Sequence, residues 1–181
     1  YILRDDIRTH GSGNAGLTNF FRTFGGPLTF VVILTDVLKA VVAVWVGVLT
    51  VQYWGGGTIW AQEEIAFEIV KYWSGLFCLL GHMFPCMFGF RGGKGILSGG
   101  TVAFLLDWRL ALLTRYVSLG SIYAAASFPV GTWLFVSHDR MIMLLSLIIT
   151  ALILWKHRAN FMRLIHGKES KLTFHKKKEG V

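Results

Sequence analysis

The sequence contains an apolar run from Leu28 to Val51 that is long enough to cross a lipid bilayer as a single α-helix, since a crossing takes about 20 residues. Three further apolar runs follow at 63–80, 116–137 and 141–155. Hydrophobic residues make up 54% of the 181 positions and charged residues only 15%, a balance too apolar for an ordinary soluble domain. We therefore predict an all-α fold, a polytopic transmembrane helical bundle with glycine-rich cytoplasmic loops, in which residues 1–181 form a single domain.

Two of the apolar runs carry charged residues at helical spacing. Asp36 and Lys39 lie three residues apart in the first run, so they can pair on one face of a helix. Glu64, Glu68 and Lys71 are likewise spaced to share a face in the second run. An ionisable residue inside a membrane span is a functional candidate by default, and a structural pair near one end of the span is the alternative.

The positive charge of the chain lies mostly at its C-terminal end. From Lys156 onward there are eight Lys or Arg residues against two Glu, which is typical of the cytoplasmic side of a membrane protein. The loop 52–62 has no Lys or Arg and is expected on the opposite side, so that residues 1–26, 81–100 and the basic tail 156–181 all face the cytoplasm. The basic residues lack the motifs and aromatic interleaving of nucleic-acid binding, so we expect the lipid bilayer, and no nucleic acid, as a partner.

A glycine-rich basic loop at 81–100, GHMFPCMFGFRGGKGILSGG, separates two apolar stretches. Glycines let backbone N–H groups approach a ligand closely, and the cations Arg91 and Lys94 favour an anion. The loop does not match a nucleotide-triphosphate loop, because Phe88 stands where the first glycine is needed and Gly95 replaces the Ser or Thr after the lysine. An anion site and a flexible connector near the membrane surface are both compatible with this composition.

A second glycine-rich segment, GSGNAG at 11–16, matches the dinucleotide-binding pattern GxGxxG literally. That interpretation fails, because no buried strand precedes the segment and no βαβ unit follows it. The segment can still turn backbone N–H groups toward an anion, with Thr18 and Arg22 nearby. A turn that caps the next helix is the alternative.

His157 and Asn160 lie three residues apart, so a helix would direct both toward the same place. His157 is a candidate for proton transfer near neutral pH, although a histidine after a membrane span is also a common interfacial residue. No His is followed five residues later by Asp, and neither HExxH nor a paired-cysteine metal site is present. We therefore expect no metal and no cofactor.

Four segments together resemble one known family. They are GSGNAGLTN with Arg22, GHMFP followed by FRGGKG, RYVSLGS at 115–121, and HRANFMRLIHGKE at 157–169, and they look like the motifs of bacterial acyl-phosphate-dependent glycerol-3-phosphate acyltransferases. The resemblance covers most of the chain in the family's order. It implies a multi-pass enzyme of the bacterial plasma membrane that transfers an acyl group from fatty acyl phosphate to the 1-hydroxyl of glycerol 3-phosphate, with its active site at the cytoplasmic face.

The resemblance also implies which residues bind and react. His157, Asn160 and Lys94 are expected at the catalytic centre, where the first two would orient glycerol 3-phosphate. The residues expected to bind substrate are Ser12, Gly13, Asn14, Thr18, Arg22, Gly92, Gly93, Gly95 and Ser118. An activated donor of this kind chiefly requires that two mutually repelling anions be positioned, which agrees with the lack of a recognisable Ser–His–Asp arrangement.

Two features depart from the family's pattern. The family has a membrane span before its first motif, which is missing here, so we expect an incomplete N-terminus. The family also places two helices between Lys94 and Arg115, where this sequence has about 20 residues. We expect either a shortened variant or a re-entrant or interfacial element at 96–113. A non-catalytic remnant of the family and an anion transporter are therefore the alternatives to an active acyltransferase.

Overall fold

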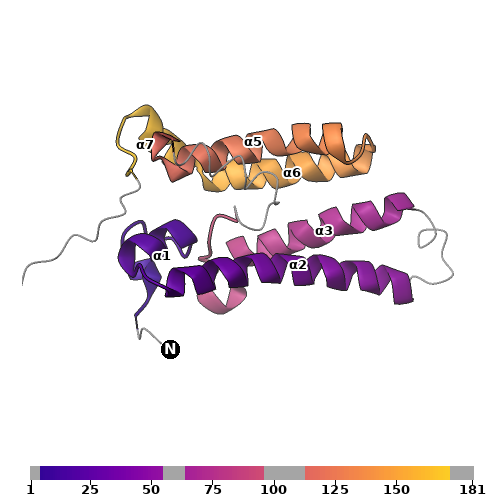
Figure 1. The fold of residues 1–181 in the computed structure, drawn as a ribbon, viewed down its shortest axis with the longest axis horizontal. Helices are drawn as coiled ribbons and strands as arrows, with labels where there is room; N and C mark the ends of the chain where they lie inside the picture. Colours follow the sequence, from indigo (N-terminus) through magenta and orange to yellow (C-terminus); the bar gives the residue numbers. More distant parts are fainter. Residues whose placement is uncertain (1–4, 55–63, 96–112, 172–181) are drawn as a thin grey trace, which may run out of the picture.

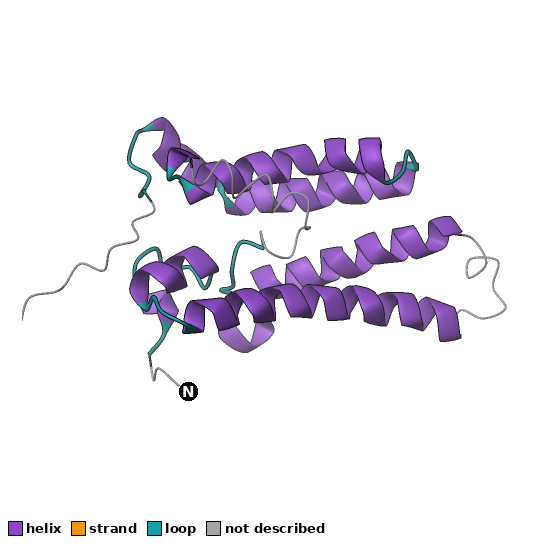
Figure 2. Cartoon of the chain, viewed as in Figure 1, coloured by secondary structure: helices purple, strands orange, loops and turns teal. Residues whose placement is uncertain are grey.

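The structure, a computed structural model, describes residues 5–54, 64–95 and 113–171. All regular elements within these ranges are α- or 3-10 helices (Figure 2), which confirms the predicted all-α fold. Most of the loop expected at 52–62, nearly all of the element expected at 96–113 and the end of the basic tail at 172–181 lie outside the described residues.

Four long helices form two antiparallel hairpins that lie against each other (Figure 1). The first hairpin consists of α2 (Leu28–Trp54) and α3 (Glu64–Met83), and the second of α5 (Val117–Phe135) and α6 (Arg140–Lys156). The bounds agree with the predicted apolar runs to within three residues at each end. Helix α3 packs against both α2 and α6, so it holds the two hairpins together.

The short helices gather at one end of this bundle, the left end in Figure 1. They are η1 (Ile7–Thr9), α1 (Leu17–Thr23) and α7 (Arg158–Ile165). The 3-10 helix η3 (Cys86–Phe88) follows α3 directly. The turn between α5 and α6 lies at the other end of the bundle.

Local sequence signals set several of the helix ends. Gly25 and Gly26 adopt positive φ angles of 58° and 66° between α1 and α2, a conformation that glycine takes without steric cost. Asp139 caps α6, since its carboxylate accepts hydrogen bonds from the N–H groups of Met141 and Ile142. At His157 the chain bends by 58° between α6 and α7, so α7 turns away from the axis of the bundle.

The core lies between α3, α5 and α6. It contains Leu76, Leu79 and Met83 from α3, Ala125 from α5, and Leu145, Ile149 and Ile153 from α6. The small side chain of Ala125 allows α5 and α6 to approach closely, a common arrangement in membrane bundles. The hydroxyl of Thr150 also donates to the carbonyl of Ala125 at 3.0 Å.

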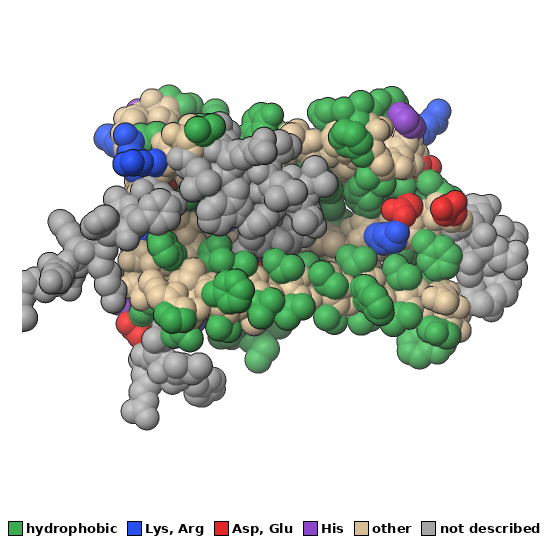
Figure 3. All heavy atoms as spheres, viewed as in Figure 1, with side chains coloured by type: hydrophobic (Ala, Val, Ile, Leu, Met, Phe, Trp, Pro, Cys, Tyr) green, Lys and Arg blue, Asp and Glu red, His purple; other side chains and the backbone are tan. Residues whose placement is uncertain are grey.

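The outer surface of the bundle is strongly apolar. Hydrophobic side chains cover the visible face of α2 in Figure 3, and Phe30, Trp45 and Trp54 are 68%, 66% and 87% exposed. Among the described helices, α2 is long and apolar enough to cross a membrane alone, and α6 with α7 meets the same standard as a bent pair. An exposed apolar surface of this extent is expected of helices in contact with lipid.

Candidate active site

The three polar clusters singled out in the sequence meet at the α1–α7 end of the bundle. Arg22 of α1 donates to the carbonyl of Ser170 beyond α7 at 2.9 Å. Lys94 donates to the side-chain oxygen of Asn160 in α7. Arg8 donates to the carbonyl of Phe88 at 3.3 Å. Segments that are distant in sequence are therefore joined directly by cationic side chains.

Asn160 lies at the centre of a buried polar network. Its side-chain oxygen accepts from Lys94, and its NH₂ group donates to the hydroxyl of Ser118 at 2.6 Å and to the carboxylate of Glu169 at 3.1 Å. Ser118 also donates to Glu169, and the guanidinium of Arg163 donates to the other carboxylate oxygen at 2.8 Å. This network joins the loop after α3 to the start of α5 and to the segment around α7.

Glu169 was not predicted as a site residue, although it ends the fourth motif. Its side chain is only 4% exposed. Burial raises the pKa of this carboxyl, but hydrogen bonds from Ser118, Arg163 and Asn160 outweigh that effect and hold the pKa below its ordinary value. Glu169 is therefore a carboxylate, and it balances part of the positive charge that gathers around it.

The surroundings of Lys94 weaken its positive charge, whereas those of Glu169 favour its negative charge. Burial, and then the nearby positive charge of Arg163, lower the pKa of Lys94 to about 8, while Glu169 partly opposes the shift. A lysine in these surroundings gains when an anion such as a phosphate arrives, because the anion stabilises its charged form. The cluster is thus suited to bind a phosphate group.

His157 is 4% exposed and lies at the bend between α6 and α7. Its Nδ1 atom is 2.8 Å from the carbonyl oxygen of Ile153. A carbonyl only accepts, so Nδ1 carries the proton and Nε2 of the neutral ring is the acceptor. His157 is the N-terminal cap of α7, the helix that contains Asn160. The expectation that the two side chains are directed toward the same place stays a prediction.

The first glycine-rich loop is folded around the side chain of Asn19, a buried residue of α1. Its amide oxygen accepts from the N–H of Ser12 at 3.0 Å, and its NH₂ group donates to the carbonyls of Ile7, His10 and Asn14. Asn19 belongs to the first motif, but its role was not predictable, since one amide that binds four backbone groups has no signal in the sequence.

Three of the predicted substrate-binding side chains project from this loop or from α1. Within the described part of the chain, the side chains of Ser12, Asn14 and Thr18 form no hydrogen bond to a protein group. They are therefore available to a ligand, and their binding role stays a prediction. Gly13 lies between Ser12 and Asn14 with a φ of 67°, and its N–H donates to the carbonyl of His10 at 2.9 Å. Its binding role also stays a prediction.

The glycines of the second loop are required by close packing. A Cβ atom at Gly92 would overlap the carbonyl of His82, one at Gly93 would overlap the His82 ring, and one at Gly95 would overlap Leu79. The N–H of Gly93 donates to the carbonyl of His82 at 3.1 Å, so this donor is engaged within the protein. Phosphate binding by the N–H groups of Gly92 and Gly95 stays a prediction.

No group of three or more His, Cys, Asp or Glu side chains in the described ranges is placed to hold a metal ion. Apart from the Glu169 carboxylate and the His157 ring, the polar atoms of the site belong to lysine, arginine, amides and hydroxyls. These are the groups that bind and stabilise oxyanions.

Comparison with known proteins identifies the family of the chain. Residues 1–167 match the family model described as glycerol-3-phosphate acyltransferase. The chain is 37% identical over 183 residues to a glycerol-3-phosphate acyltransferase of Thermoanaerobacter pseudethanolicus, covering 95% of this chain and 84% of that one. It is 35% identical over 185 residues to the enzyme of the same description from Halalkalibacterium halodurans, with 94% and 84% covered.

Two crystal structures of PlsY (YgiH), an integral membrane glycerol 3-phosphate acyltransferase, have the same fold. The glycerol 3-phosphate form superposes with a TM-score of 0.77 at 30% identity, covering 95% of this chain and 84% of that one. The lysophosphatidic acid form gives 0.72 at 32% identity, with 90% and 82% covered. The similarity confirms the predicted membrane helical bundle. The chain belongs to the glycerol-3-phosphate acyltransferase family.

Proposed function

We propose that the protein transfers an acyl group from fatty acyl phosphate to the 1-hydroxyl of glycerol 3-phosphate, in phospholipid synthesis. The products are 1-acylglycerol 3-phosphate and inorganic phosphate. The observation that carries the proposal is the buried network in which Asn160 joins Lys94, Ser118 and Glu169. It unites three motif segments around a lysine that gains from binding an anion.

The reaction needs only the two substrates and a group that accepts the hydroxyl proton. The hydroxyl oxygen of glycerol 3-phosphate attacks the acyl carbon, a carbon–oxygen ester bond forms, and the bond between the acyl carbon and the phosphate oxygen breaks. The hydroxyl proton leaves with the phosphate or is taken by Nε2 of His157, the ring nitrogen free to accept. Because the donor is already activated, the protein acts chiefly by placing both substrates and stabilising the developing charge.

The roles of the remaining residues follow from charge. Lys94 binds phosphate oxygens, and Asn160 holds its ammonium group in place and orients glycerol 3-phosphate with His157. The remaining residues are assigned to binding the phosphate groups of the two substrates. They are Arg22 and Ser118, with Ser12, Gly13, Asn14 and Thr18 of the first motif and Gly92, Gly93 and Gly95 of the second.

We place this site at the cytoplasmic face of the bacterial plasma membrane. The reason is the positive-inside rule: basic residues cluster at the α1–α7 end of the bundle, including Arg22, Lys94, Arg158 and Arg163. An amphiphilic donor can reach such a site from the bilayer, while glycerol 3-phosphate enters from the aqueous side.

The test is incorporation of labelled glycerol 3-phosphate into lipid by purified protein, with acyl phosphate or a thioester as the donor. We expect product with acyl phosphate only, and loss of it in K94A. A folded wild type that binds phosphate and forms no product would indicate a non-catalytic remnant. Phosphate counterflow in vesicles without acylation would indicate an anion transporter.

A further inference from the structure

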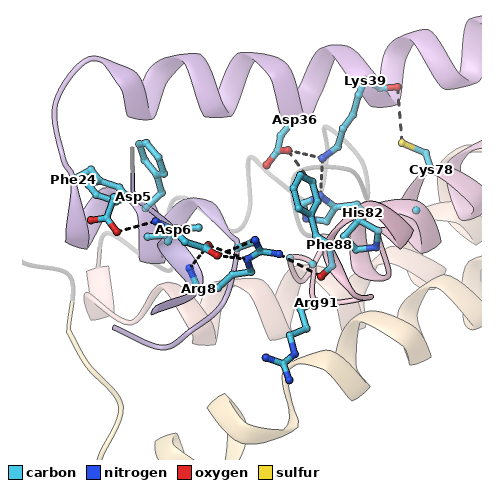
Figure 4. A pocket seen from close by; sticks show the side chains of 17 residues that line it. Asp5, Asp6, Arg8, Phe24, Asp36, Lys39, Cys78, His82, Phe88 and Arg91 are labelled. Carbon is cyan, nitrogen blue, oxygen red and sulfur yellow. Dashed lines mark hydrogen bonds and ion pairs between the residues drawn. The ribbon is translucent and has the colours of Figure 1, made fainter. Parts of the chain in front are cut away.

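A second cluster of charged groups lies beside the site, between α2 and α3. Asp36 and Lys39 of α2 meet His82 of α3 in a cavity of about 730 Å³, whose wall also includes Gly92 and Gly93 (Figure 4). The network around Asn160 does not include these three side chains. Ionisable groups in the apolar helices of a membrane bundle are costly and call for a specific role.

The three side chains form a connected chain of contacts. The ammonium of Lys39 is 2.5 Å from the carboxylate of Asp36 and 2.6 Å from Nδ1 of His82. An ammonium group only donates, so Nδ1 accepts, and the ring proton of the neutral imidazole lies on Nε2. Asp36 and His82 are 17% and 14% exposed in their side chains. Lys39 thus fixes both the tautomer and the orientation of the ring.

His82 in turn contacts Gly93 in two ways. Its carbonyl accepts the N–H of Gly93 at 3.1 Å. The Nε2 and Cε1 edge of its ring occupies the space that a Cβ of Gly93 would fill, and the carbonyl of Ala15 borders the same space. His82 therefore fixes the backbone of Gly93 where the two glycine-rich loops meet, and the next residue is Lys94.

We propose that Asp36, Lys39 and His82 are positioning residues that set the place of Lys94 through Gly93. Asp36 holds Lys39, Lys39 holds the His82 ring, and the ring and carbonyl of His82 hold the loop. The inference rests on the proposed function where its effect on acyl transfer is concerned, but the position of Lys94 can also be measured without turnover.

The chain provides a matched control. Lys71 and Glu68 of α3 form an ion pair at the same spacing and the same 2.5 Å distance as Lys39 and Asp36. Lys71 lies in the first half of α3, whereas the loop that carries Lys94 follows the last residue of that helix, Met83. K71M therefore removes the same charge from the same kind of pair, away from the loop.

The experiment compares K39M and K71M in two assays. The first is the rate at which an amine-reactive reagent modifies Lys94, followed by peptide mass spectrometry in purified protein. The second is acyl transfer. For K39M we expect a change of about threefold or more in the labelling rate and a loss of about tenfold in kcat, since small displacements of a reacting group are costly. K71M should match the wild type in both assays.

Two further variants separate positioning from general damage. K39R, which keeps a cationic donor, should restore most of the activity. If K39M fails to insert or fold, H82N replaces it: the asparagine keeps an acceptor for Lys39 but lacks the ring edge against Gly93, and it should also change the labelling of Lys94.

Wild-type labelling of Lys94 in K39M, or in H82N where K39M does not fold, would overturn the inference. A wild type that makes no product overturns the proposed function instead. In that case, the labelling rates still decide whether this cluster positions Lys94.

Discussion

Asn160 is the side chain on which most contacts of the site depend. It accepts from Lys94 and donates to Ser118 and Glu169, so one amide uses both its oxygen and its NH₂ group within the network. Replacing it leaves a buried ammonium and a buried carboxylate each short of a partner. The site then loses both its geometry and its charge balance.

For N160A we expect kcat/KM for glycerol 3-phosphate to fall by about 100-fold or more, since each hydrogen bond to a charged group is worth about 1.5–3 kcal/mol. A steady-state assay measures this. A159S, at an exposed neighbouring position in α7, should behave as wild type. Unchanged kcat/KM in N160A would mean that the network has no part in the reaction.

Lys94 gives the site a dependence on pH. Its pKa in the folded protein is about 8, so the free enzyme loses this charge as the pH rises through that value, and kcat/KM should fall there. K94R should extend activity to higher pH, because its guanidinium stays charged. A pH profile of kcat/KM that is identical in wild type and K94R would contradict this role.

The same shift has the opposite effect on stability. The pKa of Lys94 in the folded protein lies below its ordinary value of 10.5, so between about pH 8 and that value the unfolded chain binds more protons than the folded one. The contribution of Lys94 to the free energy of unfolding therefore rises with pH over this window. Loss of activity above pH 8 is thus separable from unfolding of the protein.

At the scale of the helices, the sequence is a good guide. The apolar runs predict α2, α3, α5 and α6 to within three residues, because hydropathy and helix-breaking glycines act locally. The bend at His157 has no such signal: no proline or glycine stands there. It depends on packing between α6, α7 and the rest of the bundle, which a pattern in one segment does not encode.

The contact between α2 and α3 supplies a test at this scale. A Cβ atom at Gly47 would overlap the Ser74 side chain, whereas one at Gly75 meets nothing within 4 Å. We expect G47L to lower the free energy of unfolding by about 1–3 kcal/mol through overpacking. G75L, the same substitution in the neighbouring helix, should be tolerated. Thermal unfolding in detergent compares the two, and equal midpoints would contradict the packing described.

For the whole molecule, the site could be predicted only in part. The motifs supplied Lys94, Ser118 and Asn160, which the structure brings together. The contact between Lys39 and His82 joins residues 43 positions apart, and no spacing within either helix reveals it. In the sequence, Glu169 is one of two acidic residues in the basic C-terminal segment, and nothing there indicates that it is buried. Such roles become visible only when the helices are packed.

The orientation of the molecule in the membrane is testable by thiol labelling. In a background without Cys78 and Cys86, K168C marks the α7 end and H138C the turn between α5 and α6; both positions are exposed. A membrane-impermeant maleimide should label H138C in right-side-out vesicles and K168C in inverted ones. The reverse pattern would place the site on the outer face and contradict the proposed topology.

The central claim is that the site around Lys94 and Asn160 transfers an acyl group from acyl phosphate. Its most direct test follows both products of purified wild-type protein in time: 1-acylglycerol 3-phosphate and inorganic phosphate. We predict that they form in equal amounts and only when glycerol 3-phosphate is present, with both lost in K94A and N160A. Phosphate release without acylated product, or undiminished turnover in the two variants, would contradict the account.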